Sequence, residues 1–183
     1  MFKYLKGSVT DIKKESVTLE INNLGFELHR LNRDNFELNK DFKIYICESL
    51  SLDSGFNLYG FLDINDLIMF KKLILVNGIG YKTAFQILNN VESISLFNLI
   101  SENNLTELRK ISGIGSKANI LVLELKNKLK EFNINILRYE NIHKALRTLG
   151  YKEILISKAI NSLKPNLDDE IALKEAIRVI SNG

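Results

Sequence analysis

The chain has 183 residues, of which 45% are hydrophobic and 26% charged, which is typical of one large globular domain or two to three small ones. A single cysteine and no apolar run near eighteen residues argue against a disulfide framework and a membrane span. The residues after Met1 lack the apolar core of a signal peptide, so we expect a cytoplasmic protein. The net charge of +3 is too small to indicate nucleic acid by itself, and any charge that binds a partner has to be arranged locally.

The first sixty-two residues show the alternating hydrophobicity of β-strands. Apolar and polar residues alternate in the segment 16–21, and the segments 26–28 and 42–46 repeat this period of two. Asn22 and Asn23 predict a tight turn between two of these strands. Further short strands are predicted at 2–12 and 57–61. Five strands in so short a segment favour a small barrel.

From about residue 63 the hydrophobic period becomes that of a helix. Leu67, Phe70 and Leu73 fall at helical spacing, and Asp63 or Asn65 can serve as the N-cap. The segment 63–133 is therefore predicted to be a helical domain. Its further helices are expected at 82–89, 95–101, 106–111 and 119–130.

The weakly periodic segment 134–141 is predicted to be a linker, and a compact three-helix unit follows at 142–183. In the first of these helices the apolar residues occupy positions i, i+3, i+4 and i+7, beginning at Ile142. Gly150 is placed to end this helix, and Pro165 follows the second. Asp168 stands where the third helix favours an acidic cap.

Two glycine pairs interrupt the central helices. Gly78-Ile79-Gly80 recurs 35 residues later as Gly113-Ile114-Gly115, each time between helical segments. The repeat predicts two helix-hairpin-helix units. Neither hairpin has the third glycine of the dinucleotide fingerprint or the Gly-Lys-Ser/Thr of a P-loop, so we expect no nucleotide cofactor.

The residues after each hairpin indicate phosphate binding. Glycines without a Cβ let the backbone approach a ligand, and the first N–H groups of the next helix favour an anion. Lys82 and Thr83 after the first hairpin, like Ser116 and Lys117 after the second, add an ammonium and a hydroxyl. One such hairpin could equally be a simple turn between packed helices. Its repetition favours a site that holds the backbone of DNA without reading its sequence.

The whole chain resembles the RuvA family, the Holliday-junction-binding subunit of the bacterial branch migration complex. The resemblance rests on the order and spacing of MFKYLKG, GFELH, NLYGF, NGIGYKTAFQIL, SGIGSKA, LELKNKL and ALRTLGYK. It implies an α+β multidomain fold. The expected domains are an OB-like β-barrel at 1–62, a double helix-hairpin-helix domain at 63–133 and, after the linker at 134–141, a three-helix, UBA-like domain at 142–183.

The resemblance further implies a non-catalytic subunit that holds four-way DNA junctions open in recombination and repair. It implies a homotetramer, with one or two tetramers on each junction, and two protein partners, the hexameric ATPase RuvB and the resolvase RuvC. It implies no cofactor, no metal and no membrane. By position, the DNA contacts would be Gly78, Gly80, Lys82, Thr83, Gly113, Gly115, Ser116 and Lys117.

In the tail, the positions that match the family's grip on its motor are Leu146, Leu149, Tyr151 and Ile177. Helical spacing explains Leu146, Leu149 and Ile177 equally well as core residues. Tyr151 directly follows the helix-ending Gly150 and is the better candidate for an exposed anchor.

Two features depart from the family pattern. Related sequences carry a pair of acids before the LYGF strand, which form a negative pin at the junction centre, whereas this chain has Asp53 followed by Ser54. Four copies of Asp53 around a four-fold axis would keep some repulsion, although Asp53 fits an ordinary turn equally well. The second hairpin reaches its helix one residue early, which predicts a weaker grip on phosphate.

Two other classes of function compete with the scaffold. A helix-hairpin-helix nuclease or glycosylase would need clustered carboxylates or a catalytic Asp and Lys, and beyond the second hairpin the chain offers Glu124 with no acidic partner. His29, His143 and Cys47 are better explained as structural residues than as ligands or nucleophiles. An interaction module without a DNA role would require both hairpins to be accidental.

Overall fold

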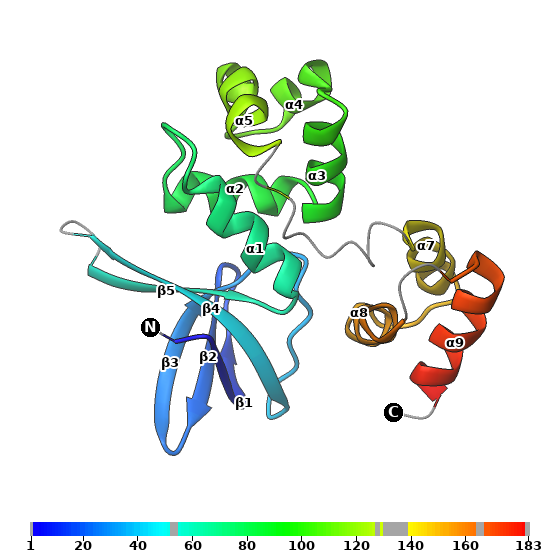
Figure 1. The fold of residues 1–183 in the computed structure, drawn as a ribbon. Helices are drawn as coiled ribbons and strands as arrows, with labels where there is room; N and C mark the ends of the chain where they lie inside the picture. The colour runs from blue at the N-terminus through cyan, green and yellow to red at the C-terminus, as the bar shows by residue number, and fades with distance from the viewer. Residues whose placement is uncertain (1, 52–54, 127–128, 130–138, 164–166, 182–183) are drawn as a thin grey trace. The chain divides into compact units, whose positions relative to one another are not determined.

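The computed structural model describes residues 2–51, 55–126, 129, 139–163 and 167–181. The chain divides into two compact units, Met1–Lys130 and Glu131–Gly183. The first unit contains all five strands and the helices up to α5, and the second contains α7 to α9 (Figure 1). Strands and helices thus occupy successive parts of the chain, which makes an α+β fold.

The strands of the first unit close into a barrel, as their number and period predict. They are β1 (Tyr4–Ile12), β2 (Ser16–Ile21), β3 (Leu24–His29), β4 (Asp41–Ser51) and β5 (Gly55–Phe61). Around the barrel they run in the order β1-β2-β3-β5-β4, and β4 pairs again with β1. The neighbours are antiparallel except β3 and β5, which pair in parallel at His29 and Tyr59.

The turn between β2 and β3 confirms the prediction from the asparagine pair. Ile21 pairs with Leu24, so the loop consists of Asn22 and Asn23, whose φ angles are 50° and 63°. Such a two-residue turn needs positive φ at both positions, and asparagine tolerates this better than most residues. The apolar residues that alternate along the flanking strands point inward, and Val17 and Leu19 are buried in the barrel core.

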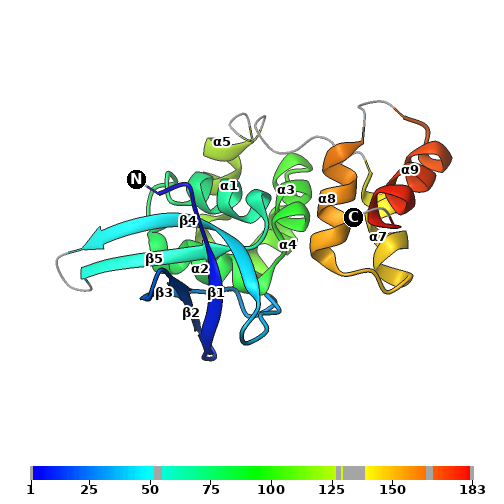
Figure 2. The ribbon, with the colours of Figure 1, turned by 90° about the horizontal axis from the view of Figure 1, so that it is seen from below.

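Strands β4 and β5 continue beyond the barrel as a two-stranded ribbon (Figures 1 and 2). Their pairing runs from Tyr45 and Phe61 to Ser51 and Gly55. Two apolar side chains near the described ends of the ribbon are exposed, Leu50 by 81% and Phe56 by 57%. The ribbon therefore offers an apolar surface that the barrel does not cover.

The helices of the first unit follow the predicted order, and their ends differ from the prediction by one or two residues, except that the last helix, predicted to run to residue 130, ends at Leu125. Residues 127, 128 and 130 lie outside the described part. They are α1 (Ile64–Leu73), α2 (Tyr81–Asn90), α3 (Ser93–Ser101), α4 (Leu105–Lys110) and α5 (Ala118–Leu125), with a 3-10 turn, η1 (Gly115–Lys117), before α5. Asp63 is the N-cap of α1, since its carboxylate accepts from Asn65 N at 2.8 Å. Asn104 caps α4 in the same way.

The second unit is a three-helix bundle of α7 (Glu140–Thr148), α8 (Glu153–Ser162) and α9 (Asp169–Ser181). Gly150 ends α7, as predicted: at φ 84° it donates to Arg147 O, while Tyr151 N donates to Leu146 O, which is the Schellman pattern. Of the predicted linker, residues 134–138 lie outside the described part. Tyr139 is fully buried, and its hydroxyl accepts from Leu167 N at 2.9 Å, so it belongs to this bundle.

Among the described residues, no helix combines the length and apolarity that crossing a bilayer requires.

A polar joint fastens the loop after β3 to the helices of the first unit. Arg33 forms an ion pair with Asp66 of α1 at 2.7 Å and donates to the Leu88 carbonyl of α2. Asp34 is 8% exposed, and its Oδ2 has no hydrogen-bond partner among the described residues. Burial, with a smaller contribution from the charge of Asp66, raises the pKa of Asp34 from 3.8 to about 7.

The raised pKa of Asp34 predicts an unusual dependence of stability on pH. Since the pKa is higher in the folded chain than in the unfolded chain, folding favours the protonated carboxyl. This contribution to the free energy of unfolding is complete below about pH 4 and is lost as the pH rises to about 7. In the unmodified chain the free energy of unfolding should fall between pH 4 and 7 by on the order of a few kcal/mol, and Asp34→Asn should remove most of this fall. Chemical denaturation at a series of pH values measures it. The exposed Asp41→Asn is the matched control, and an unchanged profile for Asp34→Asn would contradict the assignment.

Candidate nucleic-acid interface

Both predicted hairpins are four-residue turns closed by a backbone hydrogen bond. Ile79 N donates to Val76 O at 3.0 Å, and Ile114 N donates to Ile111 O at 3.1 Å. The third residue of each turn is a glycine with positive φ, 80° at Gly78 and 95° at Gly113, as in type II turns. The isoleucines in the middle are 3% and 2% exposed, so each hairpin is anchored in the core. The sequence repeat is therefore also a repeat of structure.

The four glycines of the hairpins fall into two groups. A Cβ at Gly113 would lie 3.0 Å from Ile87 Cγ1, and one at Gly78 would lie 3.4 Å from Lys117 Cε. At Gly80 and Gly115, by contrast, a Cβ would have no heavy atom of another described residue within 4 Å, apart from its neighbours in the chain. Gly78 and Gly113 therefore serve the turn and the packing, whereas Gly80 and Gly115 leave the backbone open to a ligand.

The first hairpin leads directly into the start of α2. Gly80 is the N-cap, in an extended conformation with φ −87° and ψ 177°, and no side chain caps the helix. The first N–H groups of a helix have no partner within the helix and form the positive end of its dipole. The first turn contains no acidic residue, and Lys82 is exposed there. This end of α2 thus combines the features of an anion site.

The second hairpin enters its helix through a tighter turn. Gly115, Ser116 and Lys117 form the 3-10 turn η1, and Lys117 N donates to Ile114 O at 2.9 Å. Ser116 is exposed. The sequence predicted that this hairpin reaches its helix one residue early; in the structure the 3-10 turn begins at Gly115 itself, and α5 begins only at Ala118. In the described structure this turn leaves fewer backbone N–H groups for a ligand than the start of α2 does.

Side chains tie the two hairpins to each other. Lys117 Nζ donates to the Gly78 carbonyl at 2.6 Å, and Asn77 Nδ2 donates to Glu124 Oε1 at 3.2 Å. Gln86 of α2 donates to the Ser112 hydroxyl at 3.0 Å. The half-buried Thr83 turns its methyl group toward Gly113, where a Cβ would lie 3.4 Å from it. All eight predicted DNA-contact residues therefore belong to one pair of interlocked hairpins.

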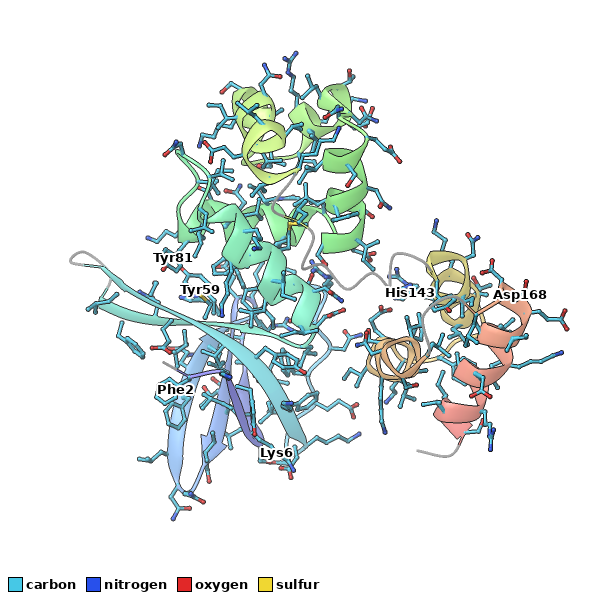
Figure 3. The ribbon with its side chains drawn as sticks, viewed as in Figure 1. Phe2, Lys6, Tyr59, Tyr81, His143 and Asp168 are labelled. Carbon is cyan, nitrogen blue, oxygen red and sulfur yellow. The ribbon has the colours of Figure 1, made fainter. Side chains whose placement is uncertain are left out.

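Aromatic side chains connect the first hairpin to the barrel. Tyr81, the first residue of α2, stacks on Tyr59 of β5 with ring centroids 5.9 Å apart and an interplanar angle of 25°. The ring centroids of Phe70 and Phe85 each lie 5.1 Å from that of Tyr59. Tyr59 and Tyr81 lie between the barrel strands and the helices (Figure 3). Burial raises the pKa of the Tyr59 hydroxyl. These rings fix the start of α2 against the barrel.

Three residues have roles in this candidate interface that the sequence did not predict. Tyr81 is 38% exposed beside the open corner of the first hairpin, and Asn77 and Glu124 bridge the hairpins. The one available signal was the aromatic residue placed directly after Gly80. Nothing in the periodicity pairs Asn77 with Glu124, because they meet through tertiary packing.

Comparison with protein families agrees with this architecture. The model of the RuvA N terminal domain matches residues 1–60, the SAM-like helix-hairpin-helix tandem matches 70–127, and the RuvA C-terminal domain matches 138–181. A protein of Thermosipho africanus is 34% identical over 190 residues, which cover 99% of this chain and 100% of that protein. The chain belongs to the RuvA family.

A second RuvA, from Fusobacterium nucleatum, is 32% identical over 189 residues, with 98% of this chain and 96% of that protein covered. Both proteins are named "Holliday junction branch migration complex subunit RuvA". The matches confirm the resemblance seen in the sequence. They also confirm the predicted fold class, since the family models fall in the expected order along the chain.

The four residues predicted to bind the motor differ in exposure. Leu146 is fully buried, which is the core role that helical spacing allowed. Leu149, the C-cap of α7, is 62% exposed, whereas Tyr151 and Ile177 are half-buried. Leu149 is therefore the most exposed of the four. The candidate pin residue Asp53 lies outside the described residues.

The remaining polar candidates have structural partners. His29 Nε2 lies 3.3 Å from Asn57 Oδ1, and the ring stacks on Tyr59. His143 of α7 pairs with Glu153 of α8 at 2.5 Å. Cys47 is buried, which raises the pKa of its thiol. Within the described part of the chain, no three His, Cys, Asp or Glu side chains gather as a metal site would need.

Gly80 and Gly113 predict different effects of substitution. Gly80→Val adds a side chain at an open corner with an ordinary φ, so we expect a stability change of about 1 kcal/mol or less and a loss of junction affinity of about tenfold or more. Gly113→Ala forces a Cβ into positive φ and against Ile87, so it should destabilise the fold by about 2 kcal/mol. Thermal unfolding and fluorescence anisotropy measure both effects. A Gly80→Val chain that binds like the unmodified protein would remove the first hairpin from the site.

Proposed function

We propose that this protein is a non-catalytic subunit that binds four-way DNA junctions and recruits a separate motor for branch migration. The observation that carries the proposal is the pair of interlocked hairpins, each with one glycine corner open to a ligand. The names of the relatives, which describe Holliday junction branch migration complex subunits, agree with it.

The chemistry of the hairpins suits the DNA backbone rather than the bases. Free N–H groups at the start of α2, its dipole and the exposed Lys82 ammonium all favour a phosphate oxygen. Gly115 and Ser116 present a similar but smaller set at the second hairpin. Contacts of this kind position a duplex without reading its sequence, which a junction-binding protein needs because branch migration passes through every sequence.

Junction binding calls for several copies of this site. In our proposal four copies form a homotetramer in the cytoplasm, one copy for each arm, and one or two tetramers hold a junction. Four copies of Asp53 would then gather at the centre, where their charge repels phosphates and helps to separate the strands. The exposed apolar side chains Leu50 and Phe56 on the β4–β5 ribbon fit a surface that the assembly covers.

The tail unit is the proposed docking site of the motor. We assign ATP hydrolysis to the hexameric ATPase RuvB, since the sequence has no P-loop. The exposed Leu149 would supply the main apolar anchor, and the half-buried Tyr151 and Ile177 would contribute further apolar surface. The resolvase RuvC would act on the same junction.

The alternative, a helix-hairpin-helix nuclease or glycosylase, has less support. Its single acidic candidate beyond the second hairpin, Glu124, accepts a hydrogen bond from Asn77 and bridges the hairpins. This hydrogen bond gives the Glu124 carboxylate a structural role, which weakens its candidacy as a catalytic group.

The direct test is binding of the purified chain to labelled junction, duplex and single-stranded DNA of matched length. We expect preference for the junction, no dependence on sequence, no cleavage and no ATPase activity without RuvB. The logarithm of the binding constant should fall linearly with the logarithm of the salt concentration, by about 0.9 for each phosphate neutralised. Equal affinity for junction and duplex would contradict the proposal, and so would cleavage.

The motor site predicts a separation of two activities. Leu149→Asp places a charge on an exposed apolar anchor, so binding to RuvB should weaken at least tenfold while junction affinity stays unchanged. Ile171→Asp is the matched control, because Ile171 is 53% exposed on α9 and is outside the predicted set. RuvB binding that survives Leu149→Asp, or that is lost equally in the control, would contradict the assignment.

A further inference from the structure

Lys117 belongs to the second hairpin by sequence, but its charged end lies at the first. Its ammonium donates to the carbonyl oxygen of Gly78 at 2.6 Å, across 39 positions of the chain. The stem also lies over Gly78, with Cε 3.4 Å from the place of a Cβ there. A lysine with this geometry holds backbone as well as carrying charge.

We propose that Lys117 is a positioning residue that sets the first hairpin in register with the second, so that both hairpins grip one duplex at the same time. This inference rests on the proposed function, since it concerns how the same interface is organised. It assigns to Lys117 a role that acts through Gly78, in addition to any attraction that its charge exerts on DNA.

The position of the bond explains why it controls the site. Gly78 is the residue with φ 80° in the first turn, and the open corner Gly80 follows it by two residues. Glycine has the most backbone freedom to lose, so an external hydrogen bond to its carbonyl restricts the orientation of the corner. The backbone from Gly78 to Gly80 leads directly into α2, so its conformation sets the direction of the first N–H groups of that helix.

Two further hydrogen bonds join the two helix-hairpin-helix units near the Lys117 contact and support a positioning role. Asn77, directly before Gly78, donates to Glu124 at 3.2 Å, and Gln86 donates to Ser112 at 3.0 Å. In these two bonds a neutral amide donates to a carboxylate oxygen and to a hydroxyl oxygen. Of the donors in these three hydrogen bonds, Lys117 is the one that also brings a positive charge to the first hairpin.

A plain phosphate ligand and a positioning residue predict different coupling to Lys82. If Lys117 only binds a phosphate of its own, losses from Lys117→Met and Lys82→Met add, because the two sites are independent. If Lys117 positions the first hairpin, Lys82→Met should cause little further loss of junction affinity in a chain that already carries Lys117→Met. The double-mutant cycle therefore separates the two roles.

The experiment measures junction affinity of the full chain as a function of salt for Lys82→Met, Lys117→Met, the double variant and Lys117→Arg. Methionine keeps the apolar stem over Gly78 and removes the ammonium. We expect Lys82→Met to cost about tenfold alone and less than about threefold in the Lys117→Met background. Lys117→Met alone should lower the salt slope by about 1.8, the value for two phosphates, because it removes the phosphate contact predicted for Lys117 itself together with the contact of the misaligned first hairpin. Lys117→Arg, which keeps the charge and a donor, should restore most of the affinity.

Additive losses, with a slope change of about 0.9 for Lys117→Met, would overturn the inference and leave the junction-binding function intact. Equal binding of junction and duplex by the unmodified chain would instead overturn the function itself. Thermal unfolding of each variant identifies any loss that comes from the fold, and a loss of affinity that tracks a loss of folded protein also overturns the inference.

Discussion

The interface depends on the close packing of the second hairpin against the helix that follows the first. Gly113 has no room for a side chain, since a Cβ would lie 3.0 Å from Ile87 and 3.4 Å from the Thr83 methyl group. Close-packed contacts of this kind have one arrangement rather than a range. Because Ile87 and Thr83 belong to α2, the contact sets the second hairpin relative to the open start of α2. In our proposal, this contact keeps the two phosphate sites at a constant separation.

The same start of α2 is fixed on its other side by aromatic rings. Tyr81 stacks on Tyr59 of the barrel, and Phe70 and Phe85 surround that ring. Aromatic pairs of this geometry stabilise by more than their buried area alone accounts for. Barrel, aromatic cluster and hairpins are thus one continuous piece of the first unit. In our proposal, this rigidity transmits the position of each DNA arm to the assembly built on the barrel.

Much of the fold was predictable because its signals are local. Alternation at Val17 and Leu19, the Asn22-Asn23 turn and the helix-ending Gly150 each depend on neighbours in the sequence, and the structure confirms them. The repeated hairpins and the RuvA resemblance were predictable for the same reason. The direction of Lys117, the division of the glycines into packed and open ones, and the role of Tyr81 were not. Each of them is decided by a residue more than twenty positions away, such as Gly78, Ile87 or Tyr59.

In our proposal, backbone N–H groups at the open hairpin corners hold DNA phosphate. Amide chemical shifts of isotope-labelled protein, recorded as four-way junction DNA is added, report on each of these N–H groups separately. We expect the largest changes at the N–H groups of Gly80, Tyr81, Lys82, Gly115 and Ser116, because a phosphate oxygen would become their acceptor. Changes that leave both corners untouched and collect elsewhere on the chain would contradict it.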